Sequence, residues 1–184
     1  MKTEKVKMLE GEYYNAFDPA LIEERQRARK MIFKFNTTKP GKLKKRRALI
    51  RRLFGSTGDK ITIEPPFYCD YGWNIHVGEG FFANYNCVIL DVNKVTIGNN
   101  CLLGPNVQIY SATHPVDPAL RLEGKEYGLP VRIGDNVWIS GSTIICPGIT
   151  IGDNVTIGAG SIVTSDIPSN VVAVGNPCRI LRKI

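Results

Sequence analysis

The sequence has no apolar run near the roughly 20 residues that a membrane-spanning helix requires. It contains only two histidines, His76 and His114, so a zinc site built from three histidines of one chain is excluded. Its five cysteines are widely spaced and form no Cys-x-x-Cys pair, which argues against a disulfide framework and favours a reducing compartment. The charged segment from Met1 to Lys7 lacks the apolar core of a signal peptide. We therefore expect neither secretion nor a membrane partner.

Acidic residues are missing from residues 39–52, which hold eight lysines and arginines. The formal net charge is 24 − 17 = +7, and without this stretch it is 16 − 17 = −1, so the basicity is local. Leu43, Ile50 and Leu53 share one helical face, which predicts an amphipathic helix over about 41–54. A run of basic residues on one helix most often forms its solvent-exposed face. Because no aromatic residue is interleaved for base stacking, we expect no nucleic-acid partner.

Another helix is predicted before the basic stretch. Asp18 is followed by a proline, the pattern of an N-cap with proline in the first turn. Leu21, Ile32 and Phe35 then recur at roughly helical spacing. We assign residues 1–58 to an N-terminal helical segment.

From about residue 59 the pattern changes to a repeat of six. Glycine often follows the repeated aliphatic residue, and a second small or branched residue comes four positions after it. An earlier set with the same spacing, from Val77 to Val95, is two residues out of phase, which predicts a bulged corner near Asp91 to Lys94. The aliphatic positions in phase are Ile97, Leu103, Ile109, Ile133, Ile139, Ile145, Ile151, Ile157 and Val163.

A six-residue period over this length is typical of a hexapeptide β-helix. Each hexapeptide supplies one short strand and a turn, three make a triangular coil, and the coils stack at about 4.8 Å. A β-sandwich is disfavoured because a period of two would not repeat glycine every six residues. We predict an all-β solenoid of about five coils over residues 59–168, a loop insertion over 110–132 and a tail over 169–184. A long loop in a compact solenoid is usually functional.

The chain resembles the maltose/galactoside O-acetyltransferases of the hexapeptide-repeat acyltransferases. The resemblance covers essentially the whole chain, and the segment from Tyr14 to Arg25 together with Thr-His-Pro narrows it to this subfamily. The motifs that carry it are Glu64-Pro-Pro-Phe67, Tyr71-Gly-Trp-Asn-Ile75, Phe82-Ala-Asn-Tyr-Asn86, Ser111-Ala-Thr-His-Pro115, Val137-Trp-Ile139, Ile151-Gly-Asp-Asn154, Gly158-Ala-Gly-Ser161 and Gly175-Asn-Pro-Cys-Arg179.

The resemblance implies a left-handed parallel β-helix, an exception to the usual right-handed crossover. It implies a cytoplasmic homotrimer whose active sites lie between subunits. The implied reaction moves acetyl from acetyl-CoA to a hydroxyl, most simply the 6-hydroxyl, of a sugar such as maltose, glucose or a galactoside, without a metal.

His114 is the candidate catalytic residue. An alcohol is a weak nucleophile near neutral pH and needs a base, and imidazole titrates near the working pH. His114 lies in the insertion, within the Thr-His-Pro motif of the resemblance. We interpret His76, which lies in a strand pattern, as a surface residue of the solenoid.

Five acidic or amide residues are candidates for binding the acceptor, on the strength of the resemblance. Asn and Asp are also good corner formers, so part of this signal is structural. Asp18 has the competing role of a helix cap, and Glu126 could contact the substrate or orient His114. The set is Asp18, Asp70, Asn84, Asp91 and Glu126.

Seven residues are candidates for binding acetyl-CoA. Gly141 lies in a Ser-Gly-Ser turn that breaks the Ile-Gly pattern, where backbone N–H groups would meet the thioester and the oxyanion. The family often has lysine where Ser165 stands, which removes one cation. Arginine suits the 3′-phosphate through its forked donors. The set is Trp138, Gly141, Ala159, Thr164, Ser165, Arg179 and Arg182.

Three alternatives were weighed against this function. A β-helical carbonic anhydrase needs three zinc-binding histidines, which the chain lacks. A nucleic-acid-binding module would rest on residues 39–52 alone. A related acetyltransferase that acts on another small acceptor, such as an amino sugar, serine or an antibiotic, stays open because the sequence does not describe the acceptor pocket.

Overall fold

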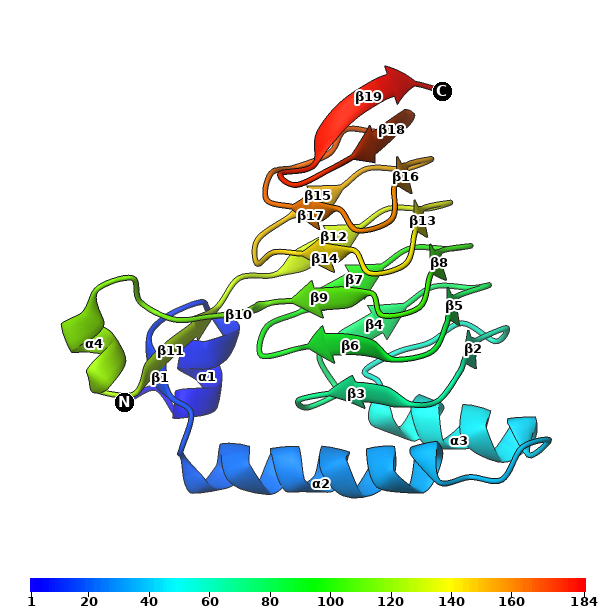
Figure 1. The fold of residues 1–184 in the computed structure, drawn as a ribbon. Coiled ribbons are helices and arrows are strands. Elements are labelled where there is room, and N and C mark those ends of the chain that lie inside the picture. Colours follow the sequence, from blue (N-terminus) through cyan, green and yellow to red (C-terminus); the bar gives the residue numbers. More distant parts are fainter.

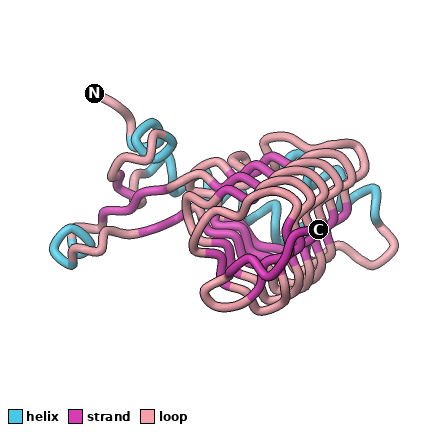
Figure 2. Tube along the Cα trace, turned by 90° about the horizontal axis from the view of Figure 1, so that it is seen from above, coloured by secondary structure: helices cyan, strands magenta, loops and turns pink.

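The six-residue repeat folds as a three-sided β-solenoid, and the two longer N-terminal helices lie across one end of it (Figure 1). The computed structural model describes all 184 residues. Viewed along the axis, the coils superimpose closely, and one arm projects from the side (Figure 2). The predicted fold class is confirmed.

Three parallel sheets form the sides of the solenoid. The seven-stranded sheet contains β2 (Thr62–Ile63), β5 (Phe82–Ala83), β8 (Leu102–Leu103), β13 (Trp138–Ile139), β16 (Thr156–Ile157), β18 (Val171–Val174) and the antiparallel edge strand β19 (Arg179–Lys183). The five-stranded sheet contains β3 (Phe67–Cys69), β6 (Cys87–Leu90), β9 (Gln108–Tyr110), β14 (Ile144–Ile145) and β17 (Ile162–Val163). The four-stranded sheet contains β4 (Ile75–Val77), β7 (Val95–Ile97), β12 (Val131–Ile133) and β15 (Thr150–Ile151).

The repeated aliphatic residues point inward and stack on one another. In the five-stranded sheet, Ile109 pairs with Ile89 on one side and with Ile145 on the other, and all three are fully buried. The seven-stranded sheet holds six parallel strands, one more than the five predicted coils. The sixth strand is β18, which pairs parallel with β16 although it lies in the segment predicted as a tail.

Stacked polar side chains hold one corner of the solenoid. Asn100, Asn136, Asn154 and Asn170 occupy equivalent turns with φ between 53° and 62°, a left-handed conformation that asparagine tolerates. Their side-chain amides bond from coil to coil at 3.3, 3.2 and 2.9 Å. The corner is therefore held by side chains as well as by the strand ladders.

The corner between the five-stranded and four-stranded sheets is enlarged in the early coils. The predicted phase slip lies here, since eight residues instead of six separate Ile89 from Ile97. Asp91 and Asn93 fill this corner and are buried. In the next coil the same corner opens into the arm, residues 112–128, which contains β10 (Ala112–Thr113), α4 (Pro118–Leu122) and β11 (Lys125–Gly128).

Three helices precede the solenoid: α1 (Glu4–Leu9), α2 (Pro19–Asn36) and α3 (Leu43–Leu53). Both predicted helices are confirmed as α2 and α3. Between α1 and α2, the strand β1 (Tyr14–Asn15) pairs antiparallel with β11, so the N-terminal segment also holds the arm. No helix combines the length and hydropathy that crossing a bilayer requires.

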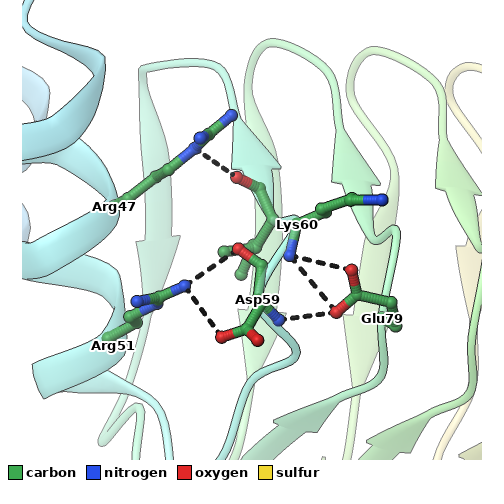
Figure 3. Close-up of polar contacts among 6 residues, drawn as sticks. Arg47, Arg51, Asp59, Lys60 and Glu79 are labelled. Carbon is green, nitrogen blue, oxygen red and sulfur yellow. Dashed lines mark hydrogen bonds and ion pairs between the residues drawn. The ribbon is translucent and has the colours of Figure 1, made fainter.

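Arginines attach α3 to the first coil (Figure 3). Arg47 donates to the carbonyl of Ile61 at 3.0 Å, and Arg51 donates to the carbonyl of Asp59 at 2.9 Å. The carboxylate of Glu79 accepts from the backbone N–H of Asp59 at 2.6 Å, which links the same turn to the next coil.

The asparagine corner predicts a measurable difference between two substitutions. Asn136→Ala should lower the free energy of unfolding by about 2 kcal/mol, because alanine loses the amide bonds and adopts φ > 0 unfavourably. Asn136→Gly loses the same bonds but tolerates the conformation, so its loss should be less than about 1 kcal/mol. Urea unfolding of both variants provides the measurement, and equal losses would contradict this account of the corner.

Candidate active site

A group of carboxylates occupies the enlarged corner. Asp91 is completely buried, and its Oδ1 accepts hydrogen bonds from the backbone N–H groups of Asp70 at 3.0 Å and Tyr71 at 2.9 Å. Its Oδ2 is buried without a hydrogen-bond partner. Asp91 therefore fixes the backbone that presents Asp70, one coil earlier.

Burial raises the pKa of both carboxylic acids in this corner. The pKa of Asp91 rises to about 7, with the nearby Asp70 carboxylate acting in the same direction. The pKa of Asp70 rises to about 6, mainly through burial and then through the Glu126 carboxylate, while Arg25 and Arg29 oppose the shift. Glu126 thus lies close to Asp70, although it belongs to the arm.

The arm brings His114 to the same corner. Ala112 pairs with Gly128 and Thr113 with Tyr127, so continuing this antiparallel register places His114 opposite Glu126. Nδ1 of His114 lies 3.3 Å from the carbonyl oxygen of Lys125. His114, Glu126, Asp70 and Asp91 are the predicted residues that the structure groups around one corner.

Arg25 and Tyr71 form a hydrogen-bonded pair beside this group, and neither was among the predicted site residues. Arg25 donates to the hydroxyl of Tyr71 at 2.6 Å and to the carbonyl of Ala16 at 2.5 Å. Tyr14 lies opposite Glu126 in the β1–β11 pair and is buried. This half-buried arginine partner was not visible in the sequence because 46 residues separate Arg25 from Tyr71.

Asp18 and His76 have structural roles in this chain. Oδ1 of Asp18 accepts from the backbone N–H groups of Ala20 at 3.0 Å and Leu21 at 3.4 Å, which caps α2. His76 lies on the outer face of β4, where its Nδ1 is 3.0 Å from Oγ of Ser56. Burial, then Lys94, lowers the pKa of His76.

Asn84 lies in a different corner, between the seven-stranded and five-stranded sheets. The structure therefore does not group it with Asp70 and Asp91. The turn that holds Gly104 stacks directly on it, and the turns that hold Gly141 and Ala159 follow in the same column. The carbonyl of Gly141 accepts from the N–H of Gly160 at 3.0 Å, which ties two of these turns together. The backbone N–H groups of Gly141 and Ala159 donate no hydrogen bond within the chain. Two donors are thus available on the outside of this corner.

The other predicted cofactor-binding residues lie in the later coils. Trp138 points outward from β13 and is half exposed. Thr164 and Ser165 follow β17 and are exposed. Arg179 and Arg182 lie on β19 at the end of the solenoid, and neither forms an ion pair within the chain.

One chain thus carries two separate groups of candidate residues. The arm projects from one side of the solenoid, and β13 lies along another side (Figure 1). The narrow five-stranded sheet separates the enlarged corner from the corner of Gly141. The two groups face each other only if a second molecule packs beside the first.

Family models match three parts of the chain. Residues 7–58 match the maltose acetyltransferase hexapeptide capping motif, and residues 130–165 match the bacterial transferase hexapeptide with six repeats. Residues 94–112 match the hexapeptide repeat of succinyl-transferase.

Individual relatives extend the match to the whole chain. The galactoside O-acetyltransferase of Escherichia coli K12 is 46% identical over 182 residues, which cover 99% of this chain and 89% of that protein. The crystal structure of a maltose O-acetyltransferase from Clostridium difficile 630 is 60% identical with a TM-score of 0.99 and covers 100% of this chain and 98% of its own. A galactoside acetyltransferase in complex with coenzyme A is 44% identical with a TM-score of 0.97 and covers 100% and 92%.

The buried Asp91 predicts a pH dependence of stability. Its folded-state pKa of about 7 lies above the unfolded value near 3.9, so the folded state holds the proton more tightly and stability falls as pH rises between these values. From pH 5 to pH 8 this group alone should lower the free energy of unfolding by about 2–3 kcal/mol. Asp91→Asn should remove that part of the loss, and urea unfolding at both pH values measures it.

Asp59→Asn serves as the control for this prediction. The Asp59 side chain is 96% exposed, so the variant should keep the pH slope of the unmodified protein. An Asp91→Asn variant with an unchanged slope would show that Asp91 does not carry the effect.

Proposed function

Because the chain belongs to the maltose and galactoside O-acetyltransferases of the hexapeptide-repeat acyltransferases, we propose that His114 acts as general base in moving acetyl from acetyl-CoA to a sugar hydroxyl. The chain is an acetyltransferase of this type, and a structure similar to it holds coenzyme A. The placement of His114 on the arm opposite Glu126, whose carboxylate lies close enough to raise the pKa of Asp70, is the observation that carries the proposal.

The contact of His114 with Lys125 supports its role as a base. A carbonyl only accepts, so the 3.3 Å contact favours the tautomer with the proton on Nδ1 and leaves Nε2 free to accept one. A base fixed in this way saves the entropy of searching for the hydroxyl. The Asp70 and Glu126 carboxylates accept hydrogen bonds from further sugar hydroxyls and orient the acceptor, with the buried Asp91 holding Asp70 in place.

The proposed reaction balances without another reactant. Nε2 of His114 removes the proton of the acceptor hydroxyl as its oxygen forms a bond to the acetyl carbonyl carbon. We assign to Gly141, whose N–H donates no bond within the chain, the stabilisation of the negative charge on the carbonyl oxygen. When the carbon–sulfur bond breaks, His114 returns the proton to the CoA thiolate, leaving the acetyl ester and CoA.

The residues proposed to hold acetyl-CoA follow the axis of the solenoid. Trp138, Gly141 and Ala159 serve the pantetheine arm, where the free N–H of Ala159 meets its amide oxygens. Thr164 and Ser165 lie near the adenine end. Arg179 and Arg182 meet the 3′-phosphate, for which their guanidinium groups are suited because neither is held in an ion pair. Two of the acceptor-binding candidates lie away from the carboxylates. Asn84 would contact the acceptor from the Gly141 corner, and Asp18 would contact it only through Oδ2, the oxygen that does not cap α2.

We place the two groups together in a homotrimer, so that the arm of one subunit faces the Gly141 corner of the next. The outer faces of the solenoid differ in polarity, and packing between subunits would use the apolar one. Leu102 and Trp138 are neighbours on the seven-stranded sheet and are 46% and 52% exposed. The four-stranded sheet instead exposes polar residues such as Thr96 and Arg132. Apolar outer strips of this kind mark an interface.

The proposal divides the chain into three parts with different tasks. Residues 1–58 support the acceptor side, residues 59–168 form the solenoid, and residues 169–184 close it near CoA. The five cysteines are free thiols, which fits a cytoplasmic enzyme.

His114→Ala should lower kcat by about 10²–10⁴ while leaving the affinity for acetyl-CoA nearly unchanged, because general-base catalysis contributes about that factor. His76→Ala is the matched control and should keep its rate. Since only neutral imidazole accepts a proton, kcat should also fall on the acid side. Free CoA release with maltose, glucose and a galactoside measures these rates, and a correctly folded His114→Ala variant with most of its activity would contradict the mechanism.

The same assay distinguishes the alternative acceptor class. Faster release of CoA with an amino sugar, serine or an amino-bearing antibiotic than with any neutral sugar would assign the site to that acceptor and contradict the sugar ester as product.

Leu102→Glu should weaken the trimer, because a charge in the apolar strip between Phe82 and Trp138 would be buried on assembly. Light scattering should then give a mass below three times 20.4 kDa at micromolar concentration, and activity should fall with the mass. Thr96→Glu on the polar four-stranded sheet should leave both unchanged. A chain that scatters as a monomer without substitution would exclude the shared site.

A further inference from the structure

The end of the solenoid that carries the helices has an extreme charge bias. Residues 25–58 contain 13 lysines and arginines and no acidic residue. The remaining residues hold 11 basic and 17 acidic side chains, a balance of −6. This segment forms α2 from Arg25 onward, α3 and their connection, which lie across the end of the solenoid opposite β19 (Figure 1).

The arginines and the lysines of this segment behave differently. Arg46 donates to the carbonyl of Thr38 at 3.1 Å and lies 3.6 Å from Glu64, and Arg47 and Arg51 bond to the first coil (Figure 3). These arginines account for the packing of α3. In contrast, the six lysines have no hydrogen bond or ion pair from their ammonium groups: Lys30, Lys34, Lys39, Lys42, Lys44 and Lys45.

Four of these lysines surround one hollow between the end of α2 and the start of α3. The hollow has a volume of about 660 Å³ and is lined by Lys34, Lys39, Lys42 and Lys45, with Leu49 as its single apolar residue. No carboxylate lines it. The mutual repulsion of four such cations destabilises the fold unless an anion offsets it.

Backbone groups around the hollow add to its positive character. The hydroxyls of Thr37 and Thr38 donate to the carbonyls of Phe33 and Lys34 at 2.7 and 2.6 Å, which covers the negative end of α2. At the start of α3 the N-cap position is Lys42, with no side-chain cap and no acid in the first turn. The negative end of α2 is therefore covered, and the start of α3 carries no acidic cap.

We propose that this hollow binds a compact ligand with several phosphate groups. Several flexible ammonium groups around one concave space suit a small anion of high charge. The volume lies in the range of small-molecule sites. No aromatic side chain lines the hollow to stack a base, which argues against a nucleic acid held through its bases. The site is distinct from that proposed for CoA, whose arginines lie at the other end of the solenoid.

Inorganic tripolyphosphate is the probe that tests the proposal, added to the full chain in a calorimetric titration. Saturable binding of one tripolyphosphate per chain is expected, weakening as salt rises from about 50 to about 200 mM because the ammonium groups are exposed. Lys39→Glu/Lys42→Glu should lower the affinity at least about tenfold, since it reverses two of the four charges. The acetyltransferase rate should stay unchanged and report the fold of the variant.

The matched control is Lys60→Glu/Lys94→Glu, two exposed lysines outside the hollow. Both variants reduce the formal charge from +7 to +3, so a response to net charge alone would be equal in the two. The control should bind tripolyphosphate within about twofold of the unmodified chain. Equal losses in the two variants, or no saturable binding by the unmodified chain, would overturn the proposal.

Two further experiments test whether the phosphate groups belong to a nucleic acid or to a membrane. Duplex DNA that displaces tripolyphosphate and binds more tightly would replace the compact ligand with a nucleic acid. Sedimentation with phosphatidylserine vesicles, dependent on Lys39 and Lys42 and not competed by tripolyphosphate, would replace it with a membrane surface. Either result would overturn the proposal for a small ligand.

Discussion

The stacking of equivalent residues from coil to coil is the constraint on which the rest of this structure depends. Each inward aliphatic residue packs on its counterpart in the next coil, as Ile89, Ile109 and Ile145 do. A corner can therefore change its length only where the neighbouring coils accept the change. The enlarged corner meets this condition because Asp91 bonds to the coil before it, at Asp70 and Tyr71. The arm leaves the solenoid from this corner, so the position of His114 follows from the same constraint.

The sequence predicted the elements that depend on local pattern. The repeat of six, the phase slip near Asp91 and the capped helix α2 each follow from residues close together in the chain. Contacts between distant segments were not predictable in this way. The pairing of Tyr14 with Glu126 and the bond from Arg25 to Tyr71 join residues that share no periodicity. They depend on how the first 58 residues fold back against the arm.

Asn84 illustrates the limit of reasoning from single residues. The resemblance named it together with Asp70 and Asp91 as an acceptor-binding candidate, and a hexapeptide solenoid has three corners in each coil. A step of six residues along the chain leads to the next corner, which lies on a different side of the molecule. Position within the repeat, rather than distance in sequence, decides which residues share a site. By that rule Asn84 belongs with Gly141 and Ala159, along the axis and on the same corner.

The shape of a solenoid gives a physical reason for proposing a site between subunits. A three-sided prism with a filled interior presents convex corners and narrow sheets, whereas a small-molecule site is concave and surrounds its ligand. The arm supplies one wall, with His114, Glu126 and the carboxylates beneath it. The chain offers no opposite wall at that point, although its own Gly141 corner carries two unused N–H donors. A second prism packed on the apolar strip of Leu102 and Trp138 would bring such a corner to the arm, so assembly and catalysis would depend on the same surface.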